Sequence, residues 1–109
     1  MSKYNSRRVF EDGYAFDSER ECQRYKRELK LMLASGYISN LKVHPRYELL
    51  PAFEYRGKKI RAINYEADFE YEENGQTIVE DVKGYATQVF RLKEKLFKWR
   101  YRDIEFRRS

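Results

Sequence analysis

The stretch EADFEYEENGQTIVEDVKG, residues 66 to 84, decides how the chain folds. Within it, Asn74-Gly75 separates two runs in which apolar and polar residues alternate, a pattern typical of a β-hairpin closed by a two-residue turn. A turn of that length sets the register of both strands. The expected cross-strand pairs are Glu73 with Gln76, Glu72 with Thr77, Tyr71 with Ile78, Glu70 with Val79, Phe69 with Glu80, and Asp68 with Asp81.

This register brings two like charges, Asp68 and Asp81, face to face. The Cβ atoms of opposed residues lie about 4.5 to 5.5 Å apart, and the repulsion is of order 3 kcal/mol at an effective dielectric constant of about 20. A divalent cation would turn that repulsion into binding energy, since Mg²⁺ needs only one or two carboxylates besides water and phosphate oxygens. Lys83 projects from the same face as Asp81, where an ammonium group can orient or deprotonate the attacking water.

A solvated polar face is the competing interpretation of the same hairpin. In that interpretation Glu66 and Lys83 form an ordinary cross-strand ion pair, and one slipped residue or a bulge removes the opposition of the two aspartates. It leaves unexplained why two aspartates should face each other. Glu80 is the nearest rival to Asp81, but the register places Glu80 on the face opposite Asp68.

Charge is unevenly distributed along the chain. The 109 residues carry a formal net charge of +5, which is compatible with an anionic partner. Every charged residue from 66 to 81 is acidic, whereas basic residues predominate from 91 to 108. An acidic spot in a basic protein is typical of a nuclease, whose carboxylates hold a cation at the scissile phosphate while basic side chains grip the backbone.

Length and composition predict one domain, with residues 1–12 as a flexible basic arm. The single cysteine, Cys22, excludes an internal disulfide and fits a reducing, cytoplasmic compartment. No stretch approaches the roughly 18 to 20 apolar residues that a membrane span needs, so a membrane is not an expected partner.

The first half of the chain is expected to contain one helix and one bent strand. The helix begins at about Ser18 and ends at Gly36, and its apolar stripe consists of Cys22, Tyr25, Leu29, Met32 and Leu33. Residues 41–55 are expected to form a strand with bends at Pro45 and Pro51. A basic turn at 56–59 then leads into the hairpin, whose strands are expected over 60–72 and 76–83.

A second helix is expected over residues 87–101, followed by a short strand over 104–107 at the sheet edge. The apolar residues that this helix is expected to bury are Val89, Phe90, Leu92, Leu96 and Phe97. The predicted fold class is therefore α/β, with a mixed sheet and elements in the order helix, three strands, helix, strand.

The motif Ala67-Asp68-Phe69 followed by Glu80-Asp81-Val82-Lys83-Gly84 resembles the core of the PD-(D/E)XK nuclease superfamily. More narrowly, the chain resembles a phage- and prophage-encoded family of formerly unknown function that is assigned to this superfamily. The stretches that carry the narrower resemblance cover nearly the whole chain in order: Phe16-Asp17-Ser18-x-x-Glu21, PRYELLP (45–51), KKIRAI (58–63) and TQVFxLK (87–93). One departure is that Ala67 stands where a proline often precedes the first aspartate.

The resemblance implies a restriction-endonuclease-like core, in which a mixed central β-sheet is flanked by helices. It also implies Mg²⁺-dependent phosphodiester hydrolysis, with Mn²⁺ as a substitute ion. Asp68 and Asp81 carry over as metal ligands, Lys83 as the catalytic lysine, and Glu21 as the acid that the first helix supplies in many members. The residues alone leave a second role open for Glu21, because Ser18-x-x-Glu21 is also a capping box at the start of a helix.

The other candidate residues have plainer interpretations. His44 is the only histidine, so a zinc site is not expected and no role is assigned to it, and Cys22 is expected in the core. Basic side chains in the turn and on the second helix are expected to contact phosphates, with a merely solvated face as the alternative. The expected nucleic-acid contacts are Arg56, Lys58, Lys59, Gln88, Arg91, Lys95, Lys98 and Arg102.

The sequence therefore predicts a Mg²⁺-dependent endodeoxyribonuclease. Nothing resembles a base-reading helix, which favours an enzyme directed by DNA structure, such as one acting on Holliday junctions or other branched intermediates. That preference rests on analogy, and symmetric cutting of two strands would suit a homodimer. The alternative is a non-catalytic phage DNA-binding accessory protein that keeps the nuclease fold.

Overall fold

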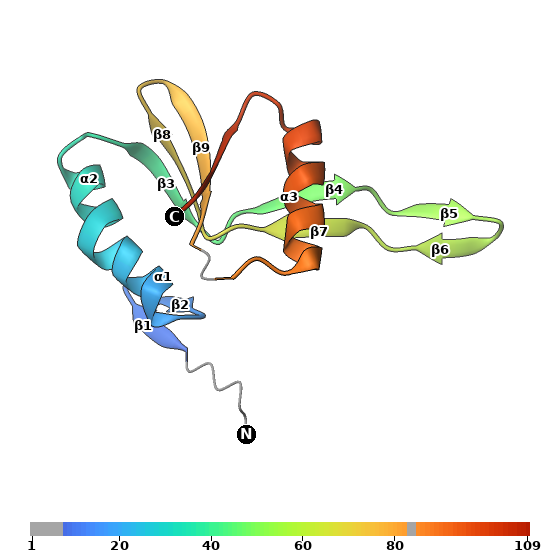
Figure 1. The fold of residues 1–109 in the computed structure, drawn as a ribbon, viewed down its shortest axis with the longest axis horizontal. Coiled ribbons are helices and arrows are strands. Elements are labelled where there is room, and N and C mark those ends of the chain that lie inside the picture. The colour runs from blue at the N-terminus through green and yellow to red at the C-terminus, as the bar shows by residue number, and fades with distance from the viewer. Residues whose placement is uncertain (1–7, 83–84) are drawn as a thin grey trace.

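The structure, a computed structural model, describes residues 8–82 and 85–109. They form a mixed α/β fold in which a four-stranded sheet lies between two helical layers (Figure 1). The first layer is a continuous helix of three segments, namely α1 (Glu19–Gln23), the π-helical η1 (Arg24–Leu29) and α2 (Lys30–Ala34). The second layer is the helix α3 (Gln88–Arg100).

The central sheet is mixed, as expected, and its strand order is β10-β9-β8-β3. Its strands are β3 (Ser39–Val43), β8 (Phe69–Glu73), β9 (Gln76–Asp81) and β10 (Glu105–Arg108). β10 runs parallel to β9, while β8 is antiparallel to both β9 and β3. The last strand thus returns to the sheet edge, as the sequence predicted.

The register predicted for the β8–β9 hairpin is confirmed. Five of the six predicted pairs form, from Glu73 with Gln76 to Phe69 with Glu80, without a shift. The predicted pair of Asp68 with Asp81 lies just beyond this ladder, because Asp68 precedes β8. Asn74 and Gly75 have φ angles of 53° and 78°, the left-handed values that a tight two-residue hairpin turn requires.

Alternate side chains of this hairpin enter two separate cores. Tyr71 and Ile78 pack with Leu29 of the first helix, whereas Val79 packs with Phe90 and Phe97 of α3. Because both faces are covered, the face that carries Asp81 is buried rather than open to solvent. The interpretation of this face as a solvated polar surface is therefore wrong at Asp81.

The middle of the chain forms one long antiparallel ribbon that leaves the sheet. β3 continues into β4 (Arg46–Leu50) and β5 (Phe53–Tyr55), and β6 (Lys58–Ile60) returns through β7 (Ile63–Glu66) to β8. β4 pairs with β7, and β5 pairs with β6. Between the paired segments the backbone N–H of His44 donates to the carbonyl of Asp68 at 2.9 Å, and that of Ala67 donates to the carbonyl of Pro45 at 3.0 Å.

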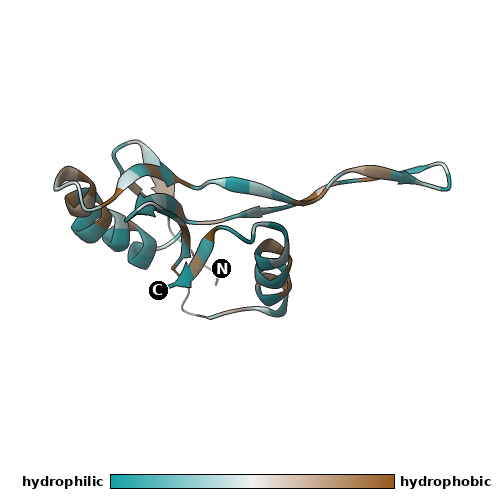
Figure 2. Cartoon of the chain, turned by 90° about the horizontal axis from the view of Figure 1, so that it is seen from above, coloured by the Kyte–Doolittle hydropathy of each residue, from teal (hydrophilic) through white to brown (hydrophobic). Residues whose placement is uncertain are grey.

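The outer part of this ribbon, residues 51–62, projects from the body as an arm (Figures 1 and 2). Every residue of β5 and β6 is exposed, and the predicted basic turn at Arg56-Gly57 forms its tip. The arm makes the molecule extended, with a radius of gyration of 15.9 Å, compared with about 13 Å for a compact chain of this length.

Four expectations about the elements need correction. Along the described part of the chain, seven strands rather than three follow the first helix and precede α3. The expected single strand over 41–55 is divided because His44 adopts a left-handed φ of 58° beside Pro45, and Pro51 lies outside any strand. Residues 9–11, expected in a flexible arm, form β1 (Val9–Glu11), which pairs with β2 (Tyr14–Phe16). Leu33, expected in the buried stripe of the first helix, is exposed.

The second helix begins after the cap residue Thr87, close to the predicted start. However, it buries fewer side chains than expected. Phe90 and Phe97 are buried, whereas Val89 and Leu92 are 63% and 58% exposed. The helix contacts the sheet through a narrow stripe that contains Phe90 and Phe97, because residues seven positions apart lie on the same face of a helix. Val89 and Leu92 lie beside that stripe. No helix among the described residues is long and apolar enough to cross a membrane.

A buried ion pair ties the first helix to the sheet. The guanidinium group of Arg24 donates to both carboxylate oxygens of Glu80, at 2.6 and 2.8 Å, and the hydroxyls of Tyr71 and Ser109 also donate to this carboxylate. Burial would raise the pKa of Glu80, but these hydrogen bonds outweigh burial and lower it. Glu80 thus remains charged inside the fold and adds stability above the ordinary carboxyl pKa.

We expect Arg24→Met to lower the free energy of unfolding by about 3 kcal/mol, because it leaves a buried carboxylate without its counter-ion. Urea unfolding measures the change. Arg27→Met, on the exposed side of the same helix, is the matched control and should cost less than about 0.5 kcal/mol. The double variant Arg24→Met with Glu80→Met should recover most of the loss, and a double variant as unstable as the single one would contradict this account.

Candidate metal-binding and catalytic site

Asp68 and Asp81 meet where β7, β8 and β9 converge. Asp81 ends β9 and is 1% exposed, and Asp68 lies in the break between β7 and β8. The backbone N–H of Val82 donates to Oδ2 of Asp68 at 2.6 Å, and the Asp81 carboxyl group is close enough to Asp68 to raise the pKa of Asp68. The hairpin register therefore brings together the two carboxyl groups that the sequence selected.

These two carboxyl groups are strongly coupled. Burial, and then the negative charge of Asp81, raise the pKa of Asp68 far above its ordinary value. Ionising both carboxyl groups would place two negative charges in contact, which electrostatic repulsion disfavours, so the pair retains a proton at neutral pH. Asp81 is also held by the hydroxyl of Tyr65, which donates to its Oδ2, and burial followed by the Asp81 charge raises the pKa of Tyr65.

Glu21 reaches the same site from the first helix. Its side chain is buried, and its Oε1 lies 3.3 Å from Nε2 of His44. Burial raises the pKa of Glu21, and both His44 and Asp68 are close enough to affect it. The hydroxyl of Ser18 caps the helix by accepting from the backbone N–H of Glu21 at 3.1 Å. The first helix therefore has the predicted cap, while the contacts of the Glu21 carboxylate are made inside the site.

His44 and Tyr65 are two site residues that the sequence did not assign. The ribbon register places His44 opposite Asp68, with the backbone hydrogen bond between them noted above. Extending the register of the Arg56-Gly57 turn would place Phe69, not Asp68, opposite His44, because the pairing shifts by one residue between Glu48 and Leu50. Tyr65 offered no signal either, since its contact with Asp81 depends on how two strands pack.

The other predicted residues fall into clear groups. Lys83 lies outside the described residues. Glu80 faces away from Asp68, as the register predicted. Cys22 is a buried free thiol in the core, which confirms its expected structural role.

The expected phosphate contacts lie away from the carboxyl groups. Arg56, Lys58 and Lys59 are exposed at the tip of the arm, at the far end of the molecule from the first helix (Figure 1). Gln88, Arg91, Lys95 and Lys98 are exposed on α3, and Arg102 follows the helix. Lys98 forms an ion pair with Glu94 at 2.8 Å. The structure therefore does not gather these side chains into one patch around the site.

The side chains of the site provide the type of ligand atom that a hard divalent cation binds. Asp68, Asp81 and Glu21 offer the carboxylate oxygens that Mg²⁺ prefers. The proton shared by the two aspartates balances one negative charge there, and a bound cation could replace it in that role. Among the described residues, no group of three or more carboxylate, histidine or cysteine side chains is arranged to hold a metal ion. Binding would therefore require loss of the proton and a small change in side-chain orientation.

We expect Asp68→Asn to raise the free energy of unfolding at about pH 8 by about 0.5 to 2 kcal/mol. An unfolded chain ionises Asp68 above about pH 4, whereas the folded protein holds its proton, so wild-type stability falls as pH rises through this range. Asparagine can still accept from the N–H of Val82 and donate to Asp81. Urea unfolding between about pH 5 and 8 measures the effect, with Glu72→Gln in the following strand, β8, as the control. A variant less stable than wild type at the higher pH would contradict the raised pKa.

The comparisons with known proteins identify a family and no individual relative. A family described as a protein of unknown function, DUF1064, matches residues 1–109, which is the whole chain. No curated protein and no solved structure matches the chain. The chain therefore belongs to the DUF1064 family.

Proposed function

We propose that this protein is a Mg²⁺-dependent nuclease that hydrolyses phosphodiester bonds of DNA. The observation that carries the proposal is the buried contact between Asp68 and Asp81, which Glu21 joins from another element. Such a cluster costs stability, and residues with strongly perturbed pKa values are enriched at functional sites. The proposal includes membership of the PD-(D/E)XK superfamily, a restriction-endonuclease-like core, and a phage or prophage origin with action in the host cytoplasm.

Asp68 and Asp81, with Glu21, would hold the ion. When bound, Mg²⁺ would supply a water activated for attack and would stabilise negative charge on the phosphate. Tyr65 holds Asp81 in place through its hydroxyl, and His44 does the same for Glu21. Lys83, two residues after Asp81 in the chain, would orient the attacking water or neutralise charge on the phosphate.

The proposed substrate is DNA that is recognised through its backbone. The arm carries Arg56, Lys58, Lys59 and Arg61 against one acidic residue, Glu54. A projecting two-stranded ribbon has dimensions that fit the major groove of a duplex. Phosphate contacts from such residues position a duplex without reading its sequence. Branched intermediates such as Holliday junctions, cut by a C₂ dimer, remain the proposed preference.

A non-catalytic DNA-binding protein is the second candidate function. The observation that favours it is that no three metal-binding side chains of the described residues are already grouped to hold an ion. In this alternative the carboxyl groups stay protonated and coupled, and the basic residues alone engage DNA. The two candidates differ in whether Mg²⁺ binds at Asp68 and Asp81.

We expect Mg²⁺ to bind the wild-type protein with an affinity that increases with pH, by up to about tenfold per pH unit, because binding releases the proton shared by Asp68 and Asp81. Isothermal titration calorimetry in two buffers of different ionisation enthalpy measures both the affinity and the released proton. Asp81→Asn should abolish binding, whereas Glu72→Gln should leave it unchanged. A wild-type affinity that does not depend on pH would contradict the shared-proton site.

We expect the protein to cut DNA in Mg²⁺ or Mn²⁺ and not in EDTA. Gel assays should compare labelled four-way junction, flap, linear duplex and single-stranded DNA. Asp81→Asn and Lys83→Ala should each reduce the rate about 100-fold or more, because each removes a group that acts on the reacting phosphate. Equal cleavage by Asp81→Asn and wild type would indicate a contaminating nuclease. The absence of cleavage of any substrate by pure wild-type protein would favour the non-catalytic alternative.

A further inference from the structure

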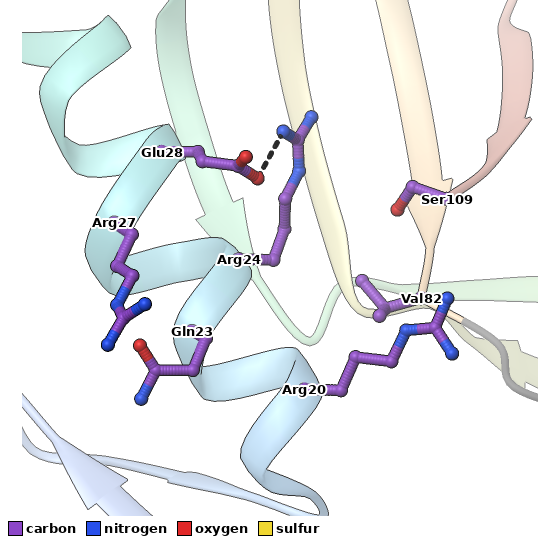
Figure 3. Close-up of a pocket in the computed structure, with 7 residues that line it drawn as sticks. All are labelled: Arg20, Gln23, Arg24, Arg27, Glu28, Val82 and Ser109. Atoms are coloured by element: carbon purple, nitrogen blue, oxygen red, sulfur yellow. Dashed lines mark hydrogen bonds and ion pairs between the residues drawn. The ribbon is translucent and has the colours of Figure 1, made fainter.

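A groove lined by arginines runs beside the carboxyl site. It has a volume of about 440 Å³ and lies between the first helix and the ends of β9 and β10. Arg20, Arg24 and Arg27 project around it from the helix, and Val82 and Ser109 lie across from them (Figure 3). None of these three arginines was among the expected nucleic-acid contacts.

Two of the three arginines retain an uncompensated charge. Arg24 is held by Glu80 and by Glu28, at 2.6 and 2.8 Å. Arg20 and Arg27 are exposed, and no carboxylate within residues 8–82 and 85–109 pairs with either guanidinium group. Two guanidinium groups without a carboxylate partner at the rim of one groove form a positive lining that suits an anionic ligand.

The position of the groove relates it to the site. Val82 lines the groove, and its backbone N–H donates to Asp68. Arg20 directly precedes Glu21 in the chain. A chain of phosphates lying in the groove would therefore continue toward the carboxyl groups.

The helix itself is irregular at this point. Arg24 and Arg27 belong to the π-helical segment η1, and π-helical turns within α-helices occur frequently at functional sites. Arg20 and Arg27 are separated along the helix axis by about 10 Å, which matches the rise of about three nucleotides of a strand. Several linked phosphates fit this spacing better than one small anion does.

We propose that this groove binds the phosphodiester backbone of the nucleic-acid strand next to the bond to be cut, with Arg20 and Arg27 each contacting a phosphate. The inference rests on the proposed nuclease function, since it assigns the groove to the same substrate. Arg24 acts as a positioning residue, because Glu80 and Glu28 hold its guanidinium group and it ties the helix that carries the other two arginines to β9. The contacts would give affinity without sequence preference.

The test is DNA binding in EDTA, measured by fluorescence anisotropy with a labelled single-stranded oligonucleotide and a labelled duplex over a range of salt concentrations. We expect the double variant Arg20→Gln with Arg27→Gln to bind about tenfold more weakly or worse. Its slope of log affinity against log salt should be smaller by about 1.5 to 2, because two phosphate contacts are lost. Lys26→Gln, on the same helix but paired with Glu11, is the matched control and should leave affinity and slope unchanged.

Three outcomes would overturn the inference. The first is a double variant with the affinity and salt slope of the wild type, and the second is a wild-type protein that binds neither oligonucleotide. The third is saturable binding of inorganic phosphate that depends on both arginines while DNA affinity does not, since the groove would then hold a free anion. A protein that binds DNA through these arginines but never cuts it would support the groove and contradict the nuclease proposal.

Discussion

The contact between Asp68 and Asp81 depends on one geometric constraint, which is the two-residue turn at Asn74-Gly75. That turn sets the register of β8 and β9, and the register carries the two aspartates to the same end of the hairpin on the same face. The ribbon register then brings His44 opposite Asp68. A shift of one residue in the hairpin would exchange Asp81 for Glu80 and separate the two carboxyl groups.

Adjacent residues of β9 illustrate two ways of burying a carboxyl group. Glu80 faces the first helix, where Arg24 and two hydroxyls lower its pKa and make it a stabilising group. Asp81 faces the other side, where it meets Asp68 and raises the pKa of that group. The first arrangement ties a helix to the sheet, and the second keeps a proton on the carboxyl pair that a bound cation would replace. This contrast on a single strand is the physical reason for assigning a structural role to Glu80 and a functional role to Asp81.

Local patterns predicted the hairpin, its register and both helices, because the Asn74-Gly75 turn, the Ser18 cap and the apolar periodicity are each set by nearby residues. The arm was missed because Pro45 and Pro51 suggested a bent strand, whereas they lie between the segments of a ribbon that continues past them. Burial of the site was also missed, since it depends on where α3 packs. His44 and Tyr65 joined the site through tertiary contacts, which composition and spacing do not encode.

The central claim is that Asp68 and Asp81 form a cation site. The most direct measurement is a crystal structure of the protein soaked in Mn²⁺, with anomalous scattering used to locate the ion. The account predicts an anomalous peak bound by carboxylate oxygens of Asp68 and Asp81, and its absence in crystals of Asp81→Asn. Well-ordered wild-type crystals with no peak at these two residues, or with a peak that persists in the variant, would contradict it.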